Sequence, residues 1–117
     1  MQVVELKNSQ SNKVLISKVE IARSFIERGR GLLGRKSLDT QAGLWILHCN
    51  SIHTFFMKFA IDCVFLDKNL RVTAVYENVR PWRLIGPLWK ARSVIELTSG
   101  QARKAGIQVG DQLYVGA

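Results

Sequence analysis

Short runs of branched and aromatic residues, separated by turn-forming residues, fill most of the chain from Gly43 onward. Such runs are typical of strands and are too short for helices of ordinary length. The predicted strands cover residues 3–6, 14–22, 43–49, 52–56, 61–67, 70–78, 94–97 and 112–115. Polar turns at 8–12 and 67–69 predict that the strands on either side of each turn form a hairpin.

A first helix is predicted by Ser24 and Glu27, which stand three apart and can form a capping box. An apolar stripe follows with helical spacing and is expected to face the core. It consists of Phe25, Ile26, Gly29, Leu32 and Leu33. We expect Gly34 to end this helix, and Gly29 and Gly31 to allow another backbone segment to approach closely.

A second short helix is predicted by another capping box at residues 98–101 and by Gly106, which would end it. The strands outnumber the helices, so the predicted fold is mostly β (α+β). We expect a small, partly closed barrel or sandwich with two short helices over open faces or edges. A chain of 117 residues is expected to form a single domain, residues 1–117.

The chain shows neither a signal peptide nor a run of about 20 apolar residues, so we expect a soluble, cytoplasmic protein without a membrane span. Its two cysteines, Cys49 and Cys63, are too few for a disulfide scaffold or a four-cysteine metal site. We expect both thiols to be reduced and packed in the interior.

Basic residues exceed acidic ones, with 17 Lys and Arg against 9 Asp and Glu and a net charge of +8. This balance excludes an acidic solvating protein and favours anionic partners. Two segments, 23–36 and 80–92, account for the whole excess. We therefore expect an anionic small molecule or an acidic protein surface as the partner.

The second basic segment lies in a predicted loop at 79–93, where the prolines disfavour a continuous helix or central strand. Trp82 and Trp89 are each followed by a cation, Arg83 and Lys90, a mixture suited to bases or lipid headgroups. No RNA-recognition signature, helix-turn-helix spacing or zinc knuckle accompanies it, so nucleic acid stays an alternative partner. The loop either presents these aromatic residues to a partner or packs them inward.

Side chains capable of metal binding or thiol catalysis gather between residues 48 and 63. They are His48, Cys49, Ser51, His53, Asp62 and Cys63. In an extended strand Cys49, Ser51 and His53 share one face, whereas His48 points to the other. At most three ligands could then meet, so we expect neither a metal nor another cofactor. The alternative is a hydrolase, with Cys49 as nucleophile and His53 as base.

Two acidic residues, Asp62 and Glu96, stand inside apolar strands and must find partners or incur a desolvation cost. Arg28 and Arg35 are the expected partners, because a guanidinium can bind a carboxylate through two hydrogen bonds. Such a cluster would be either a structural ion pair or the lining of a ligand pocket. The alternative hydrolase could also use such a cluster of Asp62 and an arginine as its catalytic residues.

The R-x-x-G-L-x-x-R pattern at residues 28–35 resembles the opening of domain-of-unknown-function family 192, also called uncharacterised protein family 0127. Three further blocks agree in order: 56–58 with 61–67, 94–97 with Gly100, and 106–111. Phe59 and Ala60 depart from the pattern, because family members often have Asn-Thr there. The resemblance implies a compact, mostly β fold in a bacterial or archaeal protein and no particular reaction; we expect a bacterial source.

The function predicted from these features is a small, non-catalytic β domain that binds an anionic ligand or an acidic partner. The alternatives are the hydrolase described above and a nucleic-acid-binding module. The predicted binding residues are Arg28, Arg35, Asp62, Arg80, Trp82, Arg83, Trp89 and Glu96. The catalytic candidates of the alternative hydrolase are Cys49, His53 and Asp62.

Overall fold

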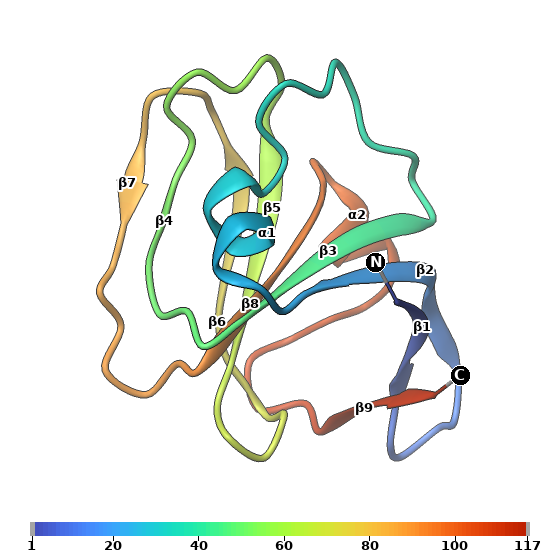
Figure 1. Ribbon diagram of the computed structural model, residues 1–117. Coiled ribbons are helices and arrows are strands. Elements are labelled where there is room, and N and C mark those ends of the chain that lie inside the picture. Colours follow the sequence, from blue (N-terminus) through green and yellow to red (C-terminus); the bar gives the residue numbers. More distant parts are fainter. Residues whose placement is uncertain (1, 117) are drawn as a thin grey trace.

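The computed structural model describes residues 2–116, except for the side chains of Phe25, Ile26 and Arg30. One seven-stranded sheet dominates the described chain, with the strand order β6-β5-β8-β3-β2-β1-β9 (Figure 1). Its strands are β1 (Val3–Asn8), β2 (Val14–Ala22), β3 (Ala42–Leu47), β5 (Ile61–Leu66), β6 (Val72–Val79), β8 (Ser93–Thr98) and β9 (Leu113–Gly116). Two short strands, β4 (Ile52–His53) and β7 (Leu84–Ile85), form a separate ladder on the left in Figure 1.

The large sheet curls around a core of aliphatic side chains but does not close. Between its edge strands β6 and β9 the described chain forms an isolated bridge, Arg71 to Gln112. Leu113 also donates its N–H to the carbonyl of Leu70 at 3.0 Å. The mostly β, partly closed fold predicted from the sequence is therefore confirmed, and so are the hairpins β1–β2 and β5–β6.

Helix α1 (Phe25–Arg30) belongs to the crossover between the parallel strands β2 and β3. The predicted capping box is present: the Ser24 hydroxyl accepts the Glu27 N–H at 3.0 Å, and the Glu27 carboxylate accepts the Ser24 N–H at 3.2 Å. Of the predicted apolar stripe, Leu32 is buried, whereas the side chains of Phe25 and Ile26 lie outside the described residues.

Two expectations for the glycines of this helix are wrong. The helix ends at Gly31, whose positive φ of 50° a glycine adopts readily, so Gly34 is not its stop. Among the described atoms outside the backbone of α1, none lies within 4 Å of a Cβ built on Gly29, so no described backbone segment approaches closely there.

Helix α2 (Gln101–Lys104) begins without the predicted capping box. Its N-cap is Gly100, which has no side chain to accept a hydrogen bond from the N–H groups of the first turn. Instead, the carboxylate of Asp62, on the neighbouring strand β5, accepts the Ala102 N–H at 2.9 Å. A residue distant in sequence therefore satisfies the helix end that we expected Thr98 to cap. The predicted end of the helix is confirmed, because Gly106 follows it with a positive φ of 72°.

Candidate functional site

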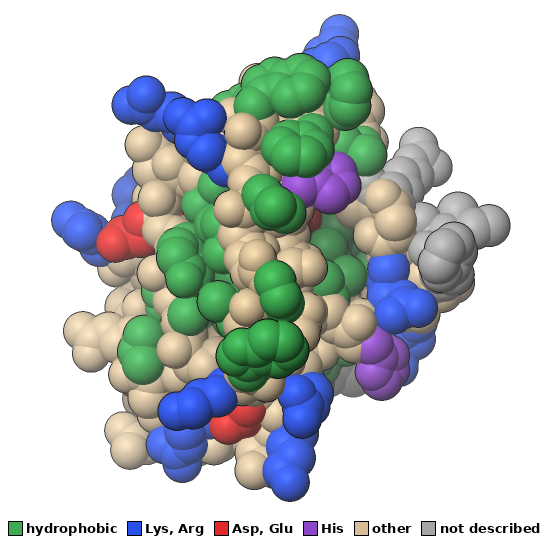
Figure 2. All heavy atoms as spheres, turned by 90° about the vertical axis from the view of Figure 1, so that its left-hand side faces the viewer, with side chains coloured by type: hydrophobic (Ala, Val, Ile, Leu, Met, Phe, Trp, Pro, Cys, Tyr) green, Lys and Arg blue, Asp and Glu red, His purple; other side chains and the backbone are tan. Residues whose placement is uncertain are grey.

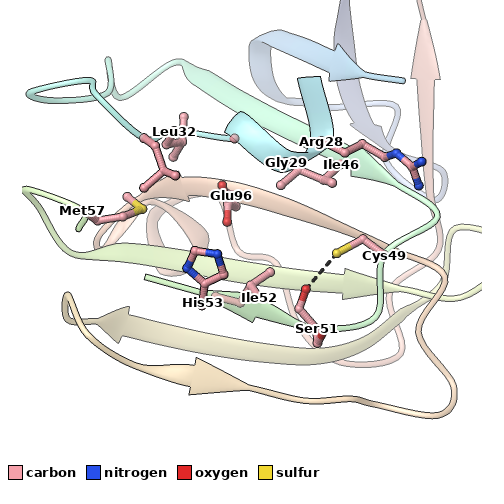
Figure 3. Close-up of a pocket in the computed structure, with 12 residues that line it drawn as sticks. Arg28, Gly29, Leu32, Ile46, Cys49, Ser51, Ile52, His53, Met57 and Glu96 are labelled. Carbon is pink, nitrogen blue, oxygen red and sulfur yellow. Dashed lines mark hydrogen bonds between the residues drawn. The ribbon is translucent and has the colours of Figure 1, made fainter. Parts of the chain in front are cut away.

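A pocket of about 90 Å³ lies between α1, β4 and β8 (Figure 3). Apolar side chains form much of its wall, among them Leu32, Ile46, Ile52 and Met57. Its polar side chains are Arg28, Cys49, Ser51, His53 and Glu96. Residues from four separate parts of the sequence thus enclose one small space in which a carboxylate, a thiol and an imidazole are the reactive groups.

Glu96 occupies the middle of β8, where its strand neighbours are Leu44 on β3 and Cys63 on β5. Only 3% of the residue is exposed, and its carboxylate has no hydrogen bond or ion pair with any of the described side chains, which do not include those of Phe25, Ile26 and Arg30. Burial away from water raises the pKa of Glu96 from 4.5 to about 7. The group is therefore an uncompensated acid that faces the pocket (Figure 3).

The residues predicted to share a strand face, Cys49, Ser51 and His53, do line this one pocket. The Cys49 thiol donates to the Ser51 carbonyl at 2.8 Å, which fixes the sulfur beside the cavity. Burial raises the pKa of Cys49, and burial together with the nearby Glu96 charge raises that of Cys63. Both cysteines are free thiols held in the protonated form, which is the opposite of an activated nucleophile.

We expect iodoacetamide at pH 7 to alkylate both cysteines slowly in the folded protein and quickly after unfolding in urea, because only the thiolate reacts. Intact-mass spectrometry over time counts the adducts, and the unfolded protein is the control. Labelling of Cys49 in the folded state at the rate of a free thiol would contradict this expectation and support the hydrolase.

Asp62 does not have the arginine partner predicted from the sequence. It is fully buried, and its two carboxylate oxygens accept backbone N–H groups, from Asn78 at 2.9 Å and from Ala102 at 2.9 Å. It thereby joins β5 to the end of β6 and the start of α2. Asp62 is a structural residue in this arrangement and lies outside the pocket lining, which removes it from both the predicted catalytic and the predicted binding sets.

The two arginines that were expected to pair with Asp62 and Glu96 bind other groups. Arg35 forms an ion pair with Glu20 at 3.0 Å, away from the pocket. Arg28 lines the pocket, but its guanidinium points away from Glu96 in Figure 3 and donates weakly to the His48 carbonyl at 3.5 Å. Its Nε is buried without a partner among the described residues. The prediction that Asp62 and Glu96 pair with Arg28 or Arg35 is therefore wrong.

Next to the pocket, three exposed aromatic residues form a surface that we call the aromatic ledge: Phe55, Phe56 and Trp82. Phe55 stacks on the pocket residue His53 at 5.1 Å between ring centroids and on Trp82 at 5.9 Å. Phe56 contacts Trp82 at 4.7 Å, and these two residues are 71% and 56% exposed. Figure 2 shows hydrophobic side chains gathered beside a histidine on this side of the molecule.

A residue that the sequence analysis missed, Thr54, holds the ledge in place. Its hydroxyl donates to the Arg80 carbonyl at 2.6 Å and accepts the Arg83 N–H at 2.8 Å. Its backbone N–H and carbonyl bond to Arg83 and Trp82 at 2.9 and 3.0 Å. These bonds tie the chain after β4 to the segment before β7, and Thr54 is fully buried beneath them.

Exposed cations lie close in sequence to the two tryptophans of the 79–93 loop. Arg80 and Arg83 are exposed beside Trp82, and Lys90 is exposed beside Trp89. Trp89 itself is 83% exposed. The loop therefore presents both tryptophans to solvent, and the alternative in which they pack inward is wrong. Figure 2 shows Lys and Arg side chains around the hydrophobic groups at both ends of this face.

Across the part of the chain that the structure describes, no group of three His, Cys, Asp or Glu residues is arranged to hold a metal ion. Neither helix found there has the length and apolar character needed to cross a membrane.

Two solved structures share the fold. A protein of unknown function from Novosphingobium aromaticivorans gives a TM-score of 0.79 at 23% identity, covering 96% of this chain and 83% of that one. A putative transcription regulator from Sinorhizobium meliloti gives a TM-score of 0.82 at 21% identity, with 97% and 92% covered. They define the structural class, a small, mostly β domain of the same architecture.

Sequence comparison assigns the chain to one family within that structural class. The model of domain of unknown function 192 (DUF192), described as Uncharacterized ACR, matches residues 4–115. A UPF0127 protein of Pyrococcus horikoshii is 36% identical over 109 residues, which are 91% of this chain and 94% of that protein. One from Pyrococcus abyssi is 38% identical over 101 residues, 82% and 84% of the two chains. The chain belongs to the DUF192/UPF0127 family, as its motifs predicted; since these relatives are archaeal, the bacterial source stays a prediction.

Proposed function

We propose that this protein is a non-catalytic binding domain that holds an acidic segment of a partner protein on the aromatic ledge and the cations around it. The observation that carries the proposal is the exposure of Phe56 and Trp82, side by side, on a chain with a net charge of +8. Large aromatic side chains exposed together are typical of interaction surfaces, and Trp and Arg are enriched among the residues that dominate binding energy.

The backbone of the ledge supports this interpretation. Phe56 and Trp82 have positive φ values of 66° and 67°, a conformation that bulky residues rarely adopt. Such strain persists only where surrounding bonds impose it, and it concentrates at functional sites. Here the hydrogen bonds of Thr54 impose it, and the result is that both rings turn outward.

The charges around the ledge favour an acidic partner over a second copy of this chain. Residues 80–92 contain four cations and no acid, so two copies meeting at this face would repel each other. An anionic small molecule in the neighbouring pocket is disfavoured for a similar reason, because Glu96 faces that space. An acidic peptide segment with apolar side chains complements both the rings and the cations.

Single-stranded nucleic acid fits the ledge less well. Base stacking needs open ring faces. Phe55 already stacks on both His53 and Trp82 at interplanar angles of 29° and 27°, which uses ring faces within the ledge. The hydrolase alternative is disfavoured by the raised pKa of Cys49, which leaves its proposed nucleophile protonated.

The test uses a synthetic peptide of alternating Glu and Leu, titrated into the protein and followed by tryptophan fluorescence. We expect saturable binding that weakens with salt, and at least a tenfold loss of affinity in the double variant Phe56→Ala/Trp82→Ala. The matched control is Val109→Ala, which removes another exposed apolar side chain (63% exposed) and should leave the affinity unchanged.

Trp89→Ala should change the free energy of unfolding by less than about 1 kcal/mol, because the side chain is almost fully in solvent.

Tight binding of oligo-dT or anionic lipid vesicles, with no binding of the peptide, would overturn the proposal. So would peptide affinity that is equal in the wild type and the double variant.

A further inference from the structure

The pocket over Glu96 contains a charge without a counter-charge. Carboxylates are almost never fully buried unless they are paired, because an isolated buried charge loses its hydration. Glu96 is 3% exposed, and among the side chains that the structure describes no cation or donor pairs with it. A ligand that brought a positive charge to this carboxylate would remove the cost of its burial.

The described groups that face Glu96 from the surrounding elements do not supply that charge. Arg28 on α1 turns its guanidinium toward His48, away from the carboxylate (Figure 3). On the opposite side the polar groups are the Cys49 thiol, the Ser51 hydroxyl and the His53 imidazole. On the sheet, Leu44 and Cys63 flank Glu96. Apart from His53, these neighbours are apolar, uncharged or turned away.

The dimensions of the pocket limit the ligand. About 90 Å³ holds roughly three water-sized groups, and a cavity that binds benzene is larger, at about 150 Å³. Leu32, Ile52 and Met57 form an apolar wall that suits methylene groups. A charged tip with two or three carbons behind it fits this space.

We propose that this pocket binds a primary ammonium group on a short alkyl stem, with the Glu96 carboxylate as its counter-ion and the apolar wall around the stem. The ammonium can belong to a free alkylamine or to the end of a lysine side chain. This site is separate from the aromatic ledge, because its ligand is cationic and its recognition depends on a different residue.

The test is an NMR titration of the protein with n-propylammonium chloride at millimolar concentrations, as suits a ligand of about four heavy atoms. We expect amide shifts confined to the residues around the pocket, and a loss of binding of at least tenfold in Glu96→Gln. Glu77→Gln, which alters an acid on the surface, is the matched control and should bind as the wild type does. n-Propanol, which has the same size and no charge, should bind at least tenfold more weakly.

A second arm uses N-acetyl-lysine methylamide. Binding of this compound as well as propylammonium assigns the pocket to a lysine side chain, and binding of propylammonium alone assigns it to a free amine. Equal binding of propanol, unchanged binding by Glu96→Gln, or no binding of either amine would overturn the proposal.

The pH dependence gives an independent readout. Between pH 6 and 8 the propylammonium stays charged while Glu96 ionises, so the affinity should rise by roughly tenfold. His53→Gln removes the imidazole from the rim and should leave most of this rise in place. If the rise disappears in His53→Gln, the imidazole controls binding and Glu96 is not the counter-ion.

Discussion

Replacing Asp62 by alanine should lower the free energy of unfolding by about 3–5 kcal/mol, because it leaves one buried and one partly buried N–H group without acceptors. These belong to Asn78 and Ala102, each 2.9 Å from one of the two carboxylate oxygens. A hydrogen bond to a charged group contributes about 1.5–3 kcal/mol, and no water reaches a side chain that is fully buried. Urea unfolding followed by circular dichroism measures the loss.

The matched variant is Asp62→Asn, which keeps one acceptor and turns an amide N–H₂ toward the other donor. We expect it to lose about half as much stability as the alanine variant, roughly 1.5–3 kcal/mol. A loss below about 1 kcal/mol in Asp62→Ala would show that both N–H groups find other partners, and that Asp62 does not cap α2.

Glu96→Gln should stabilise the protein at alkaline pH. Burial raises the pKa of Glu96 from 4.5 to about 7, so the folded protein holds a proton that the unfolded chain has already released. The stability from this group is complete below about pH 4.5 and is lost as the pH rises through 7. This shift in pKa corresponds to roughly 3 kcal/mol of the free energy of unfolding. The wild type loses this stability by pH 8, whereas the glutamine variant should keep it.

Thermal melts of the wild type and of Glu96→Gln at pH 5 and pH 8 measure this effect. The advantage of the variant should be much larger at pH 8 than at pH 5, because only the wild type loses stability between them. Glu77→Gln, an exposed acid paired with Arg103, controls for general charge effects and should show no such difference. An advantage of Glu96→Gln that is equal at both pH values would contradict a raised pKa.

Local features of the fold could be predicted from the sequence because they depend on neighbouring residues. The second strand was predicted as 14–22, and β2 spans Val14–Ala22. The capping box of Ser24 and Glu27 forms as expected. Cys49, Ser51 and His53, which strand alternation placed on one face, do line one pocket, but β3 ends at Leu47 and the chain bends at His48 and Asn50, so alternation along a strand is not what brings them together.

The partner of Asp62 could not be predicted in the same way. The apolar run around it correctly indicated burial, and an arginine was the natural choice among side chains. The actual partners are backbone N–H groups, which every residue except proline carries and which leave no mark in the sequence. Only the tertiary arrangement of β5, β6 and α2 brings those groups to the carboxylate.

The aromatic ledge was missed in part because of an incorrect strand boundary. Continuing the strand through residues 52–56 would place Phe55 and Phe56 on opposite faces. The strand instead ends at His53, and Phe56 takes a positive φ of 66°, which brings it onto Trp82. Thr54 causes this departure through bonds to a segment that is distant in sequence.

The chemistry of the pocket depends on Glu96 being a buried carboxylate without a counter-charge. Its side-chain carboxyl carbon can be followed by ¹³C NMR between pH 3 and 9, with Glu96→Gln used to assign the resonance. We expect a midpoint near pH 7, set by burial. A midpoint near 4.5, the ordinary value of a glutamate, would show that Glu96 is hydrated or paired and would contradict the assignment of this pocket as a cation site.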